Sequence, residues 1–482
     1  MARSFPDPRL KLLNSESSCV QPGNGYKYRV ALLYPATYAV GMANLGMHLI
    51  YQGFNSLPGV ACHRFFAPWI ALKKQVTPHM EPPRSLETGE ALSRYDVIAI
   101  TLNYENDSLN VIRLLKASGI PIYQRDRGCR DPLLIAGGVV ITINPEPLAD
   151  ALDFCVLGEA EELIPELSDV IEDCWINHRD RNETLSAASA IPGVYVPSFF
   201  NVQYNEIDRV SSVSPTELQR NELKRRIISD LDSVPGSTVI HTENTEFPRL
   251  HLVEISRGCP RECRFCLIPG CYGRYRYRSV DAVISAAQAA PQGWRIGLLG
   301  AGAADHPQLI EICRRLTDLG YEFSFSSLHA SSFSPDLVKA IHIAGPRTIT
   351  IAPEVASDQR RRKIGKSITN EQLFEAVRNA GREPVKFIKA YFIVGLPGES
   401  SSDLDSIADF CLELENVLRR ANVTETTIPR LTIGVSCFVP KAMSPFERGV
   451  LHPEKELKSR LNRVIGKLKR IKELQFNHDV PR

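Results

Sequence analysis

The sequence of 482 residues lacks several features that would place the protein in a membrane, outside the cell or on a nucleic acid. It contains no run of about 18 or more apolar residues, so we expect no membrane-spanning helix. The first residues hold no apolar stretch of the kind that directs secretion, and we expect a cytoplasmic protein. The net charge at pH 7 is only +2, so the composition indicates neither a nucleic-acid nor a membrane partner.

The composition that remains is that of a soluble globular protein, with 43% hydrophobic and 23% charged residues. At this length we expect several domains. Twelve cysteines are spread along the chain, and most occur singly in apolar surroundings. We interpret those as small buried residues of a reducing compartment. Only one short stretch, residues 259–266, brings three cysteines together.

The N-terminal half alternates short apolar runs with helix-like segments. We predict strands at residues 29–34, 60–66, 97–102, 133–136 and 154–157. We predict helices between them, at 42–56, 108–116 and 159–171. This alternation is typical of a parallel sheet with helices on both faces, so we expect a Rossmann-like (flavodoxin-like) α/β domain at 26–197.

Glycines follow two of these strands, at Gly137, Gly138 and Gly158. In open parallel sheets, ligands bind beyond the carboxyl ends of the strands, where these glycines are expected. Glycines are equally what a tight turn requires. The sequence leaves both interpretations open.

The flanking segments differ in composition. We expect an irregular leader at residues 1–25 and a linker at 198–248, because the latter is more polar and lacks a clear period. The basic run at 220–226 within that linker is interpreted as a solvated face. A second α/β domain is expected at 249–450, followed by a basic amphipathic helix at 451–482.

The second half repeats the alternation of strands and helices. We predict strands at 251–255, 295–299, 322–326, 348–351, 385–394 and 431–438. We predict helices at 280–290, 308–319, 335–344, 370–380 and 402–420. Six such units predict a partial (β/α)6 barrel with its functional groups at the carboxyl ends of the strands.

Residues 453–474 carry one apolar stripe and many basic residues, the pattern of an amphipathic helix. An RNA-facing role is one interpretation of the basic side. We favour the other, a helix that flanks the barrel and turns its basic side to solvent.

The three clustered cysteines are Cys259, Cys263 and Cys266, with the spacing C-x3-C-x2-C directly after an apolar strand. Thiolates are the usual protein ligands of iron–sulfur clusters. Gly258 and Pro260 favour a loop over a continuous helix. Three thiolates leave one iron of a 4Fe-4S cluster without a protein ligand, and an open position is typical of a catalytic metal site.

A structural zinc site is the main alternative for this loop. Zinc prefers four ligands, usually in two separated C-x2-C pairs, and no second pair is present. Cys271 or His251 would have to be the fourth ligand. We therefore favour the iron–sulfur cluster and interpret Cys271 as an ordinary loop cysteine.

The triplet, with Phe265 before its last cysteine, resembles the C-x3-C-x-Φ-C signature of the radical S-adenosylmethionine (SAM) superfamily. The resemblance implies a 4Fe-4S cluster whose open iron binds SAM, and an electron donor such as flavodoxin or ferredoxin. Residues 299–302, 351–354, 392–398 and 438–441 resemble further motifs of the family, in the expected order. The resemblance to this family implies that the following residues contact SAM: Phe265, Gly300, Ala301, Gly302, Ser326, Glu354, Lys366, Val394, Gly395 and Leu396.

The N-terminal half resembles the cobalamin-binding-like domain that precedes many such barrels, through residues 136–138, 144–147 and 157–161. This resemblance makes cobalamin a candidate cofactor and Gly137, Gly138 and Gly158 candidate corrinoid-facing residues. The Asp-x-His-x-x-Gly motif of cobalamin proteins is absent after the first strand, and we interpret His48 as a helix-packing residue.

Two functions follow from these residues. The first is a radical SAM enzyme that generates a 5′-deoxyadenosyl radical, with methyl transfer as the leading reaction if cobalamin binds. No second cysteine cluster is present, which counts against sulfur insertion. The alternative is a non-catalytic iron–sulfur protein acting as an RNA-associated or redox-sensing module. The substrate is not evident, because fold does not fix it.

Overall fold

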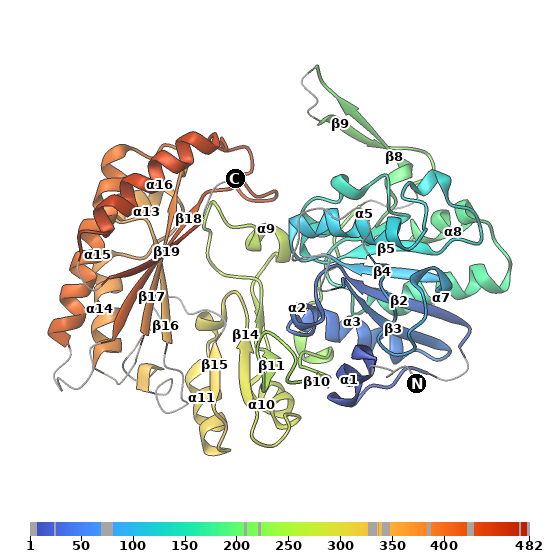
Figure 1. Cartoon of the computed structure of the whole chain (residues 1–482), viewed down its shortest axis with the longest axis horizontal. Helices are drawn as coiled ribbons and strands as arrows, with labels where there is room; N and C mark the ends of the chain where they lie inside the picture. Colours follow the sequence, from blue (N-terminus) through green and yellow to red (C-terminus); the bar gives the residue numbers. More distant parts are fainter. Residues whose placement is uncertain are drawn as a thin grey trace, which may run out of the picture. The chain divides into compact units, whose positions relative to one another are not determined.

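A computed structural model describes residues 7–23, 26–68, 81–206, 210–219, 223–325, 335, 337–339, 348–382, 387–421, 429–471 and 474–479. The chain divides into two compact units, Met1–Arg249 and Leu250–Arg482 (Figure 1). Within the described ranges, no helix is long and apolar enough to cross a membrane. Parallel sheets covered by helices make up both units, so the fold is α/β, as predicted.

The first unit is built on a six-stranded sheet with the order β3-β2-β4-β5-β6-β7. The five strands expected from the sequence are all present and parallel, and a short antiparallel strand closes one edge. The strands are β2 (Tyr28–Tyr34), β3 (Val60–Phe66), β4 (Val97–Thr101), β5 (Leu133–Gly137), β6 (Phe154–Val156) and β7 (Val194–Tyr195).

Helices cover both faces of this sheet. Alternate side chains of a strand point to opposite faces, and in β2 both sets are buried, Val30 and Leu32 in one core and Ala31 and Leu33 in another. One core includes side chains of α3 (Leu45–Asn55), α7 (Leu163–Ile176) and α8 (Arg181–Ala188). The other includes side chains of α5 (Ser108–Ala117) and α6 (Val139–Ile143).

The segments expected to be a leader and a linker both have regular structure and belong to the first unit. Asp7 accepts a hydrogen bond from the Arg9 N–H and Pro8 follows it, so helix α1 (Pro8–Asn14) begins there. Strand β1 (Ser17–Ser18) pairs with β10 (Ile240–His241). Within 198–248, β8 (Phe200–Tyr204) and β9 (Val210–Pro215) form a hairpin (Figure 1).

The second unit contains two parallel sheets. The first is β11 (Leu250–Glu254), β14 (Arg295–Leu299) and β15 (Phe323–Phe325). The second is β16 (Thr348–Glu354), β17 (Phe387–Val394), β18 (Arg430–Cys437) and β19 (Gln475–His478). The six expected strands are present. Within the described ranges these strands fall into two sheets, and no pairing joins β15 to β16.

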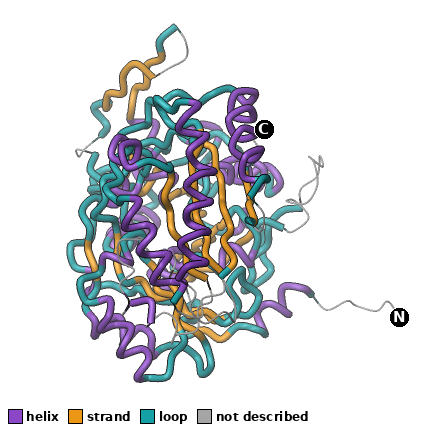
Figure 2. Tube along the Cα trace, turned by 90° about the vertical axis from the view of Figure 1, so that its left-hand side faces the viewer, coloured by secondary structure: helices purple, strands orange, loops and turns teal. Residues whose placement is uncertain are grey.

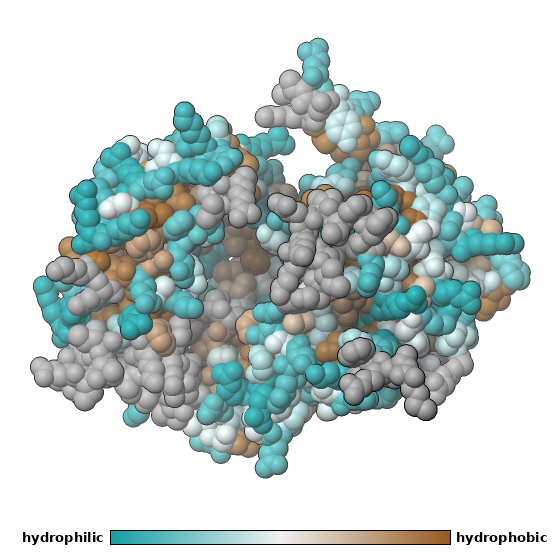
Figure 3. All heavy atoms as spheres, in the orientation of Figure 1, coloured by the Kyte–Doolittle hydropathy of each residue, from teal (hydrophilic) through white to brown (hydrophobic). Residues whose placement is uncertain are grey.

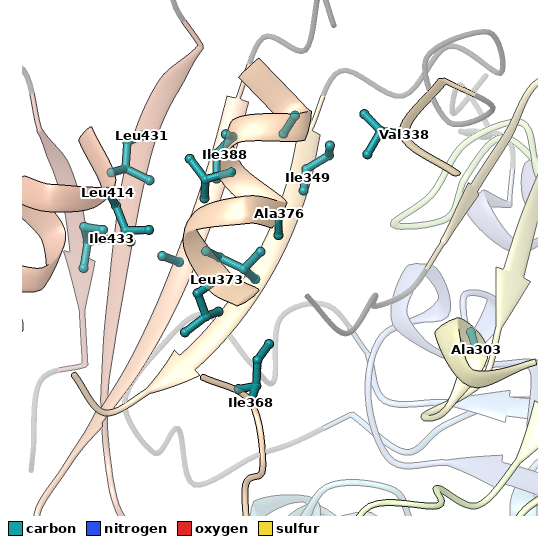
Figure 4. Close-up of a cluster of buried hydrophobic side chains, with 14 of the residues drawn as sticks. Ala303, Val338, Ile349, Ile368, Leu373, Ala376, Ile388, Leu414, Leu431 and Ile433 are labelled. Atoms are coloured by element: carbon teal, nitrogen blue, oxygen red, sulfur yellow. The ribbon is translucent and has the colours of Figure 1, made fainter. Parts of the chain in front are cut away.

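The core of the second unit lies between its strands and helices. In Figure 4, Leu373 and Ala376 of α14 (Asn370–Gly381) lie over Ile349 and Ile388 of β16 and β17. The helices of the second unit also include α10 (Val280–Gln288), α11 (Leu309–Asp318), α13 (Asp358–Lys363), α15 (Ser401–Ala421) and α16 (Glu454–Leu468). Figure 2 looks onto the helices that cover the second sheet.

The C-terminal amphipathic helix is α16, and it ends at Leu468, six residues before the predicted end. Its apolar stripe is buried in the core of the second unit: Leu457, Leu461, Val464, Ile465 and Leu468. The surface over this helix is largely hydrophilic (Figure 3). Several of its cations pair with acids of neighbouring segments, among them Arg463 with Asp405. This packing is that of a helix flanking the strands. The sequence did not indicate β19, because Phe476 is its one apolar residue.

Candidate functional site

The cysteine loop leaves the sheet at the carboxyl end of β11. Strand β12 (Ser256–Arg257) pairs antiparallel with β13 (Arg276–Tyr277), so the chain leaves and returns at one point. Between the two strands lie the three thiols and a short helix, α9 (Ile268–Tyr272). All three cysteines are partly exposed. The loop therefore presents its thiols at the edge where parallel sheets usually bind ligands.

Two glycines allow other segments to pack closely against this loop. A β-carbon at Gly365 would overlap the carbonyl oxygen of Glu262, and Gly365 has a φ of 73°. Beside it, the Arg264 N–H donates to the Ile364 carbonyl over 2.9 Å. At Gly302, a β-carbon would lie 3.0 Å from Pro260. The loop is thus held from the segment after α13 and from the turn after β14.

A buried ion-pair network lies at the base of the loop. Glu254, the last residue of β11, accepts from the Arg257 Nη2 at 2.8 Å and the Arg278 Nη2 at 2.9 Å. The side chain of Glu254 is 14% exposed and that of Arg278 is 4% exposed. Burial alone would raise the pKa of Glu254, but the two guanidinium groups prevail and lower it. The carboxylate therefore stays ionised and ties β11 to both ends of the loop.

The three thiols lie near one another without forming a single-ion site. Electrostatic interactions couple Cys263 to both Cys259 and Cys266. Within the described ranges, no three His, Cys, Asp or Glu side chains converge to hold one metal ion. A zinc ion needs its ligands about 2.3 Å away in one tetrahedron. A cubane instead distributes its thiolates over different irons, so three thiols from one loop fit a cluster better than zinc, which prefers four ligands.

Burial raises the pKa of all three thiols, and that of Cys263 reaches about 11. The ammonium of Lys366 acts in the opposite direction on each of them. Ligation requires thiolates, so binding a metal centre here must release protons. The nearby cation reduces that cost.

The two charged residues that the sequence predicted as SAM contacts, Glu354 and Lys366, are brought together. The Lys366 Nζ lies 2.9 Å from the Glu354 Oε1, and both side chains are nearly buried. Glu354 follows an irregularity at the end of β16 and has a φ of 65°, which is unusual for a non-glycine residue. Both groups interact electrostatically with Cys263. A carboxylate and an ammonium thus lie beside the thiols.

The predicted turn after β14 contacts the cysteine loop. A β-carbon at Gly300 would overlap the Ser256 hydroxyl and lie 3.0 Å from the Ser256 carbonyl oxygen, so glycine eases this approach. The Tyr275 hydroxyl donates to the Gly302 carbonyl over 2.9 Å. Ala301, between the two glycines, is exposed. Ser326, the other residue predicted in this region, lies outside the described residues.

A small apolar cluster lies beside the cysteines. It contains Leu396 and Phe438, which follow β17 and β18, and Phe265 packs against it from the cysteine loop. Val394 and Leu396 are completely buried, and Gly395 between them has a φ of 86°. The structure therefore joins the predicted segment 394–396 to the cysteine loop through Phe265.

In the first unit, the candidate corrinoid-facing glycines are half-buried and lie close to other segments of the chain. A β-carbon at Gly138 would overlap the Leu102 carbonyl, and one at Gly158 would overlap the backbone of Arg226. At Gly137, the nearest such contact is Val156. His48 is buried in α3, with its Nε2 3.0 Å from the Met42 carbonyl oxygen. These positions have the properties of tight turns and helix packing.

Sequence reasoning missed two groups near the site. The first is the Glu254 network, and the second is Glu399, whose side chain is only 2% exposed and pairs with Arg460. A charged residue at the very end of an apolar strand was the available signal for Glu254. For Glu399 the signal was its position directly after the glycine turn.

The fold and the site define a class: an α/β unit with three loop thiols at the carboxyl end of its first strand. The model of the radical SAM superfamily matches residues 253–411. The model of the N-terminal region of radical SAM proteins matches residues 46–197. The chain belongs to the radical SAM superfamily and is an enzyme of that group.

Several known proteins are similar to this chain. The uncharacterized protein MJ0966 of Methanocaldococcus jannaschii is 26% identical, over 87% of this chain and 79% of its own length. The uncharacterized methyltransferase PH0819 of Pyrococcus horikoshii is 25% identical, over 58% of each chain. The solved structure of TsrM, a radical SAM methyltransferase from Kitasatospora setae with cobalamin and a 4Fe-4S cluster bound, has a TM-score of 0.55 and 14% identity. The structural match covers 87% of this chain and 76% of the TsrM chain.

Proposed function

We propose that Cys259, Cys263 and Cys266 hold a 4Fe-4S cluster and that the protein reductively cleaves SAM. Such a cluster, when bound and reduced, supplies the one electron that breaks a C–S bond of SAM to give methionine and a 5′-deoxyadenosyl radical. The observation that carries the proposal is the cysteine loop itself. It brings three thiols to the carboxyl end of β11, and their C-x3-C-x2-C spacing leaves one iron of a cubane without a protein ligand.

The residues beside the thiols suit the polar end of SAM. The Lys366 ammonium can donate to a carboxylate, and the Glu354 carboxylate can accept from an ammonium. In the protein alone the two groups satisfy each other at 2.9 Å. An amino acid that carries both charges would exchange one ion pair for two. We assign this pair to the methionyl end of SAM.

The apolar cluster suits the other end of SAM. Leu396 and Phe438 are buried beside Phe265, and the backbone of Gly395 precedes Leu396. Apolar side chains and exposed backbone groups are what hold and orient a planar base. We assign the segment 394–396 to the adenine, and the turn at Gly300–Gly302 to the side of the site next to Pro260.

Methyl transfer is the reaction class that we favour, supported by the names of PH0819 and TsrM. Cobalamin is the candidate cofactor for it, and the solved structure of TsrM holds bound cobalamin. In this chain, Gly138 and Gly158 are half-buried, and on the side where a β-carbon would project each lies against the chain's own backbone. We assign no step to cobalamin and treat its presence as a question for spectroscopy.

The proposal is tested on anaerobically purified and reconstituted protein. We expect about four irons per chain, an iron–sulfur charge-transfer band, and 5′-deoxyadenosine after reduction in the presence of SAM. Corrinoid bands in the same spectrum would reveal cobalamin. Cys263→Ala should abolish the product, whereas Cys129→Ala, which removes an exposed cysteine of the first unit, should not change it.

Zinc in place of iron would refute the proposal. A cluster that forms normally but yields no 5′-deoxyadenosine in the reduced protein would favour the alternative, a non-catalytic iron–sulfur module. The structure weakens the RNA-associated form of that alternative, because Arg460, Arg463 and Lys467 of α16 are paired with acidic residues.

A further inference from the structure

We propose that Glu399 is a positioning residue for SAM, and that Arg460 of α16 holds it in place. The inference rests on the proposed function, since it assigns a role to the turn next to the adenine segment. It also gives a role in the SAM site to α16, which lies beyond the residues 253–411 that match the superfamily model.

The turn after β17 is closed by its own carboxylate. Gly395 and Gly398 have φ angles of 86° and 69°, so the chain reverses sharply between them. The Gly395 N–H then donates to the Glu399 Oε2 over 2.8 Å. A charged acceptor makes this bond stronger than a neutral one. Glu399 therefore fixes the orientation of the peptide that enters the adenine segment.

Arg460 keeps that carboxylate in place. Its Nη1 lies 2.9 Å from the same Oε2 of Glu399, and its Nη2 lies 2.7 Å from the Glu456 Oε1. A carboxylate that is only 2% exposed is costly unless it is paired and hydrogen-bonded. Burial raises the pKa of Glu399, and Arg460 and the Gly395 N–H both oppose that rise. The arginine thus stabilises the ionised form that binds the turn.

Two more contacts confine the turn. On one side, the Arg360 Nη2 of α13 donates to the Pro397 carbonyl over 2.6 Å. On the other side, a β-carbon at Gly395 would lie 2.9 Å from a methyl group of Leu457 in α16. The turn therefore lies between α13 and α16, and it cannot move without breaking a charged hydrogen bond.

The thiols do not depend on this arrangement. Glu399 and Arg460 bond to the turn and to α16, and within the part of the chain that the structure describes neither hydrogen-bonds to the cysteine loop. Among the described residues, the turn meets that loop through the apolar cluster, by way of Leu396 and Phe265. Loosening Glu399 should therefore weaken SAM binding while leaving cluster assembly unchanged.

The test compares Arg460→Gln with Arg463→Gln in the full-length reconstituted protein. Arg463 is a matched control, because it also joins α16 to an acid, Asp405, through hydrogen bonds of 2.7 Å, but it does not contact the turn. SAM affinity is measured by equilibrium dialysis, and iron per chain by chemical analysis. We expect Arg460→Gln to weaken SAM binding about tenfold, the effect of losing one charged hydrogen bond. Arg463→Gln should leave it unchanged.

Glu399→Gln, which preserves shape, gives a second and independent variant. It should raise the KM for SAM in 5′-deoxyadenosine formation about tenfold and change kcat by less than about twofold. Amide hydrogen exchange at Gly395 should become faster in both Glu399→Gln and Arg460→Gln, even without cluster. The double variant should bind SAM no more weakly than the worse single variant, because both substitutions act through the hydrogen bond between Glu399 and the Gly395 N–H.

The outcomes separate this inference from the proposed function. Wild-type protein without iron or without 5′-deoxyadenosine would remove the function and the inference together. An active wild type whose Glu399→Gln variant keeps the wild-type SAM affinity and Gly395 exchange rate would overturn only the positioning role. Loss of iron together with SAM affinity in Glu399→Gln would also overturn it, since that result indicates general disruption.

Discussion

Each unit contains a carboxylate that pairs with two arginines, but the two carboxylates lie at opposite ends of their strands. In the first unit, Asp153 is completely buried between Arg127 and Arg181. In the second unit, Glu254 is held between Arg257 and Arg278. In each ion-pair network, one carboxylate is shared by two guanidinium groups.

Position along the strand distinguishes them. Asp153 directly precedes β6 and also accepts from the Leu134 N–H in β5 over 2.8 Å, so it organises the amino ends of two strands. Glu254 is the last residue of β11 and connects to the loop that carries the thiols. In parallel α/β folds the carboxyl ends hold the functional groups and the amino ends mainly provide stability. The same interaction is therefore structural in one unit and supports the site in the other.

The largest expected effect comes from removing each shared carboxylate. Glu254→Gln and Asp153→Asn should each lower the free energy of unfolding of their own unit by about 3 to 5 kcal/mol, because two buried guanidinium groups lose their counter-ion. Only Glu254→Gln should also reduce the iron bound per chain after reconstitution. Denaturant unfolding and iron analysis measure the two quantities separately.

Equal loss of iron in both variants would break the comparison, since it would show that iron binding follows overall stability. Retention of full iron content by Glu254→Gln, at a temperature where the variant is folded, would show that the network does not shape the cysteine loop.

A smaller effect is expected from a pair of glycines. Gly158 in the first unit and Gly365 in the second both have positive φ, and at each a β-carbon would overlap a backbone oxygen. Gly158→Ala and Gly365→Ala should each cost about 1 to 3 kcal/mol of stability. Only Gly365→Ala displaces the cysteine loop at Glu262, so only this variant should slow cluster assembly, followed by the rise of the charge-transfer band.

The Gly158→Ala variant has a second use. If Gly158 faces a corrinoid and not Arg226, its substitution should reduce any corrinoid recovered with the protein. A corrinoid content that stays at the wild-type level, together with the loss of stability, would agree with the packing seen in the structure.

Much of the fold was predictable because its signals are local. Buried parallel strands appear as apolar runs, and the parallel strands β2 to β6 of the first unit and β11 and β14 to β18 of the second were expected, whereas the edge strands β7 and β19 were not. The cysteine loop was predictable for the same reason, since its ligands lie within a few residues. The predicted leader and linker were less accurate, because a pairing such as that of Ser17 with His241 joins distant segments.

The polar part of the site was harder to predict. Glu354 and Lys366 were both expected to contact SAM, but the sequence did not indicate that they contact each other. Glu399 and Arg460 lie far apart in the chain and meet only after α16 packs on the core. Such contacts depend on tertiary packing, which local propensity does not report.

The smallest expected effect is a difference in acid sensitivity. The two arginines hold the pKa of Glu254 below its ordinary value in the folded protein, despite the opposing effect of burial. The unfolded chain therefore binds more protons between the folded and the unfolded pKa, and stability falls as the pH decreases through that window. Wild-type protein should lose stability there more steeply than Glu254→Gln, which has no carboxyl group to protonate. Urea unfolding of both proteins across acidic pH measures the two slopes, and equal slopes would mean that the arginines do not stabilise the ionised form of Glu254.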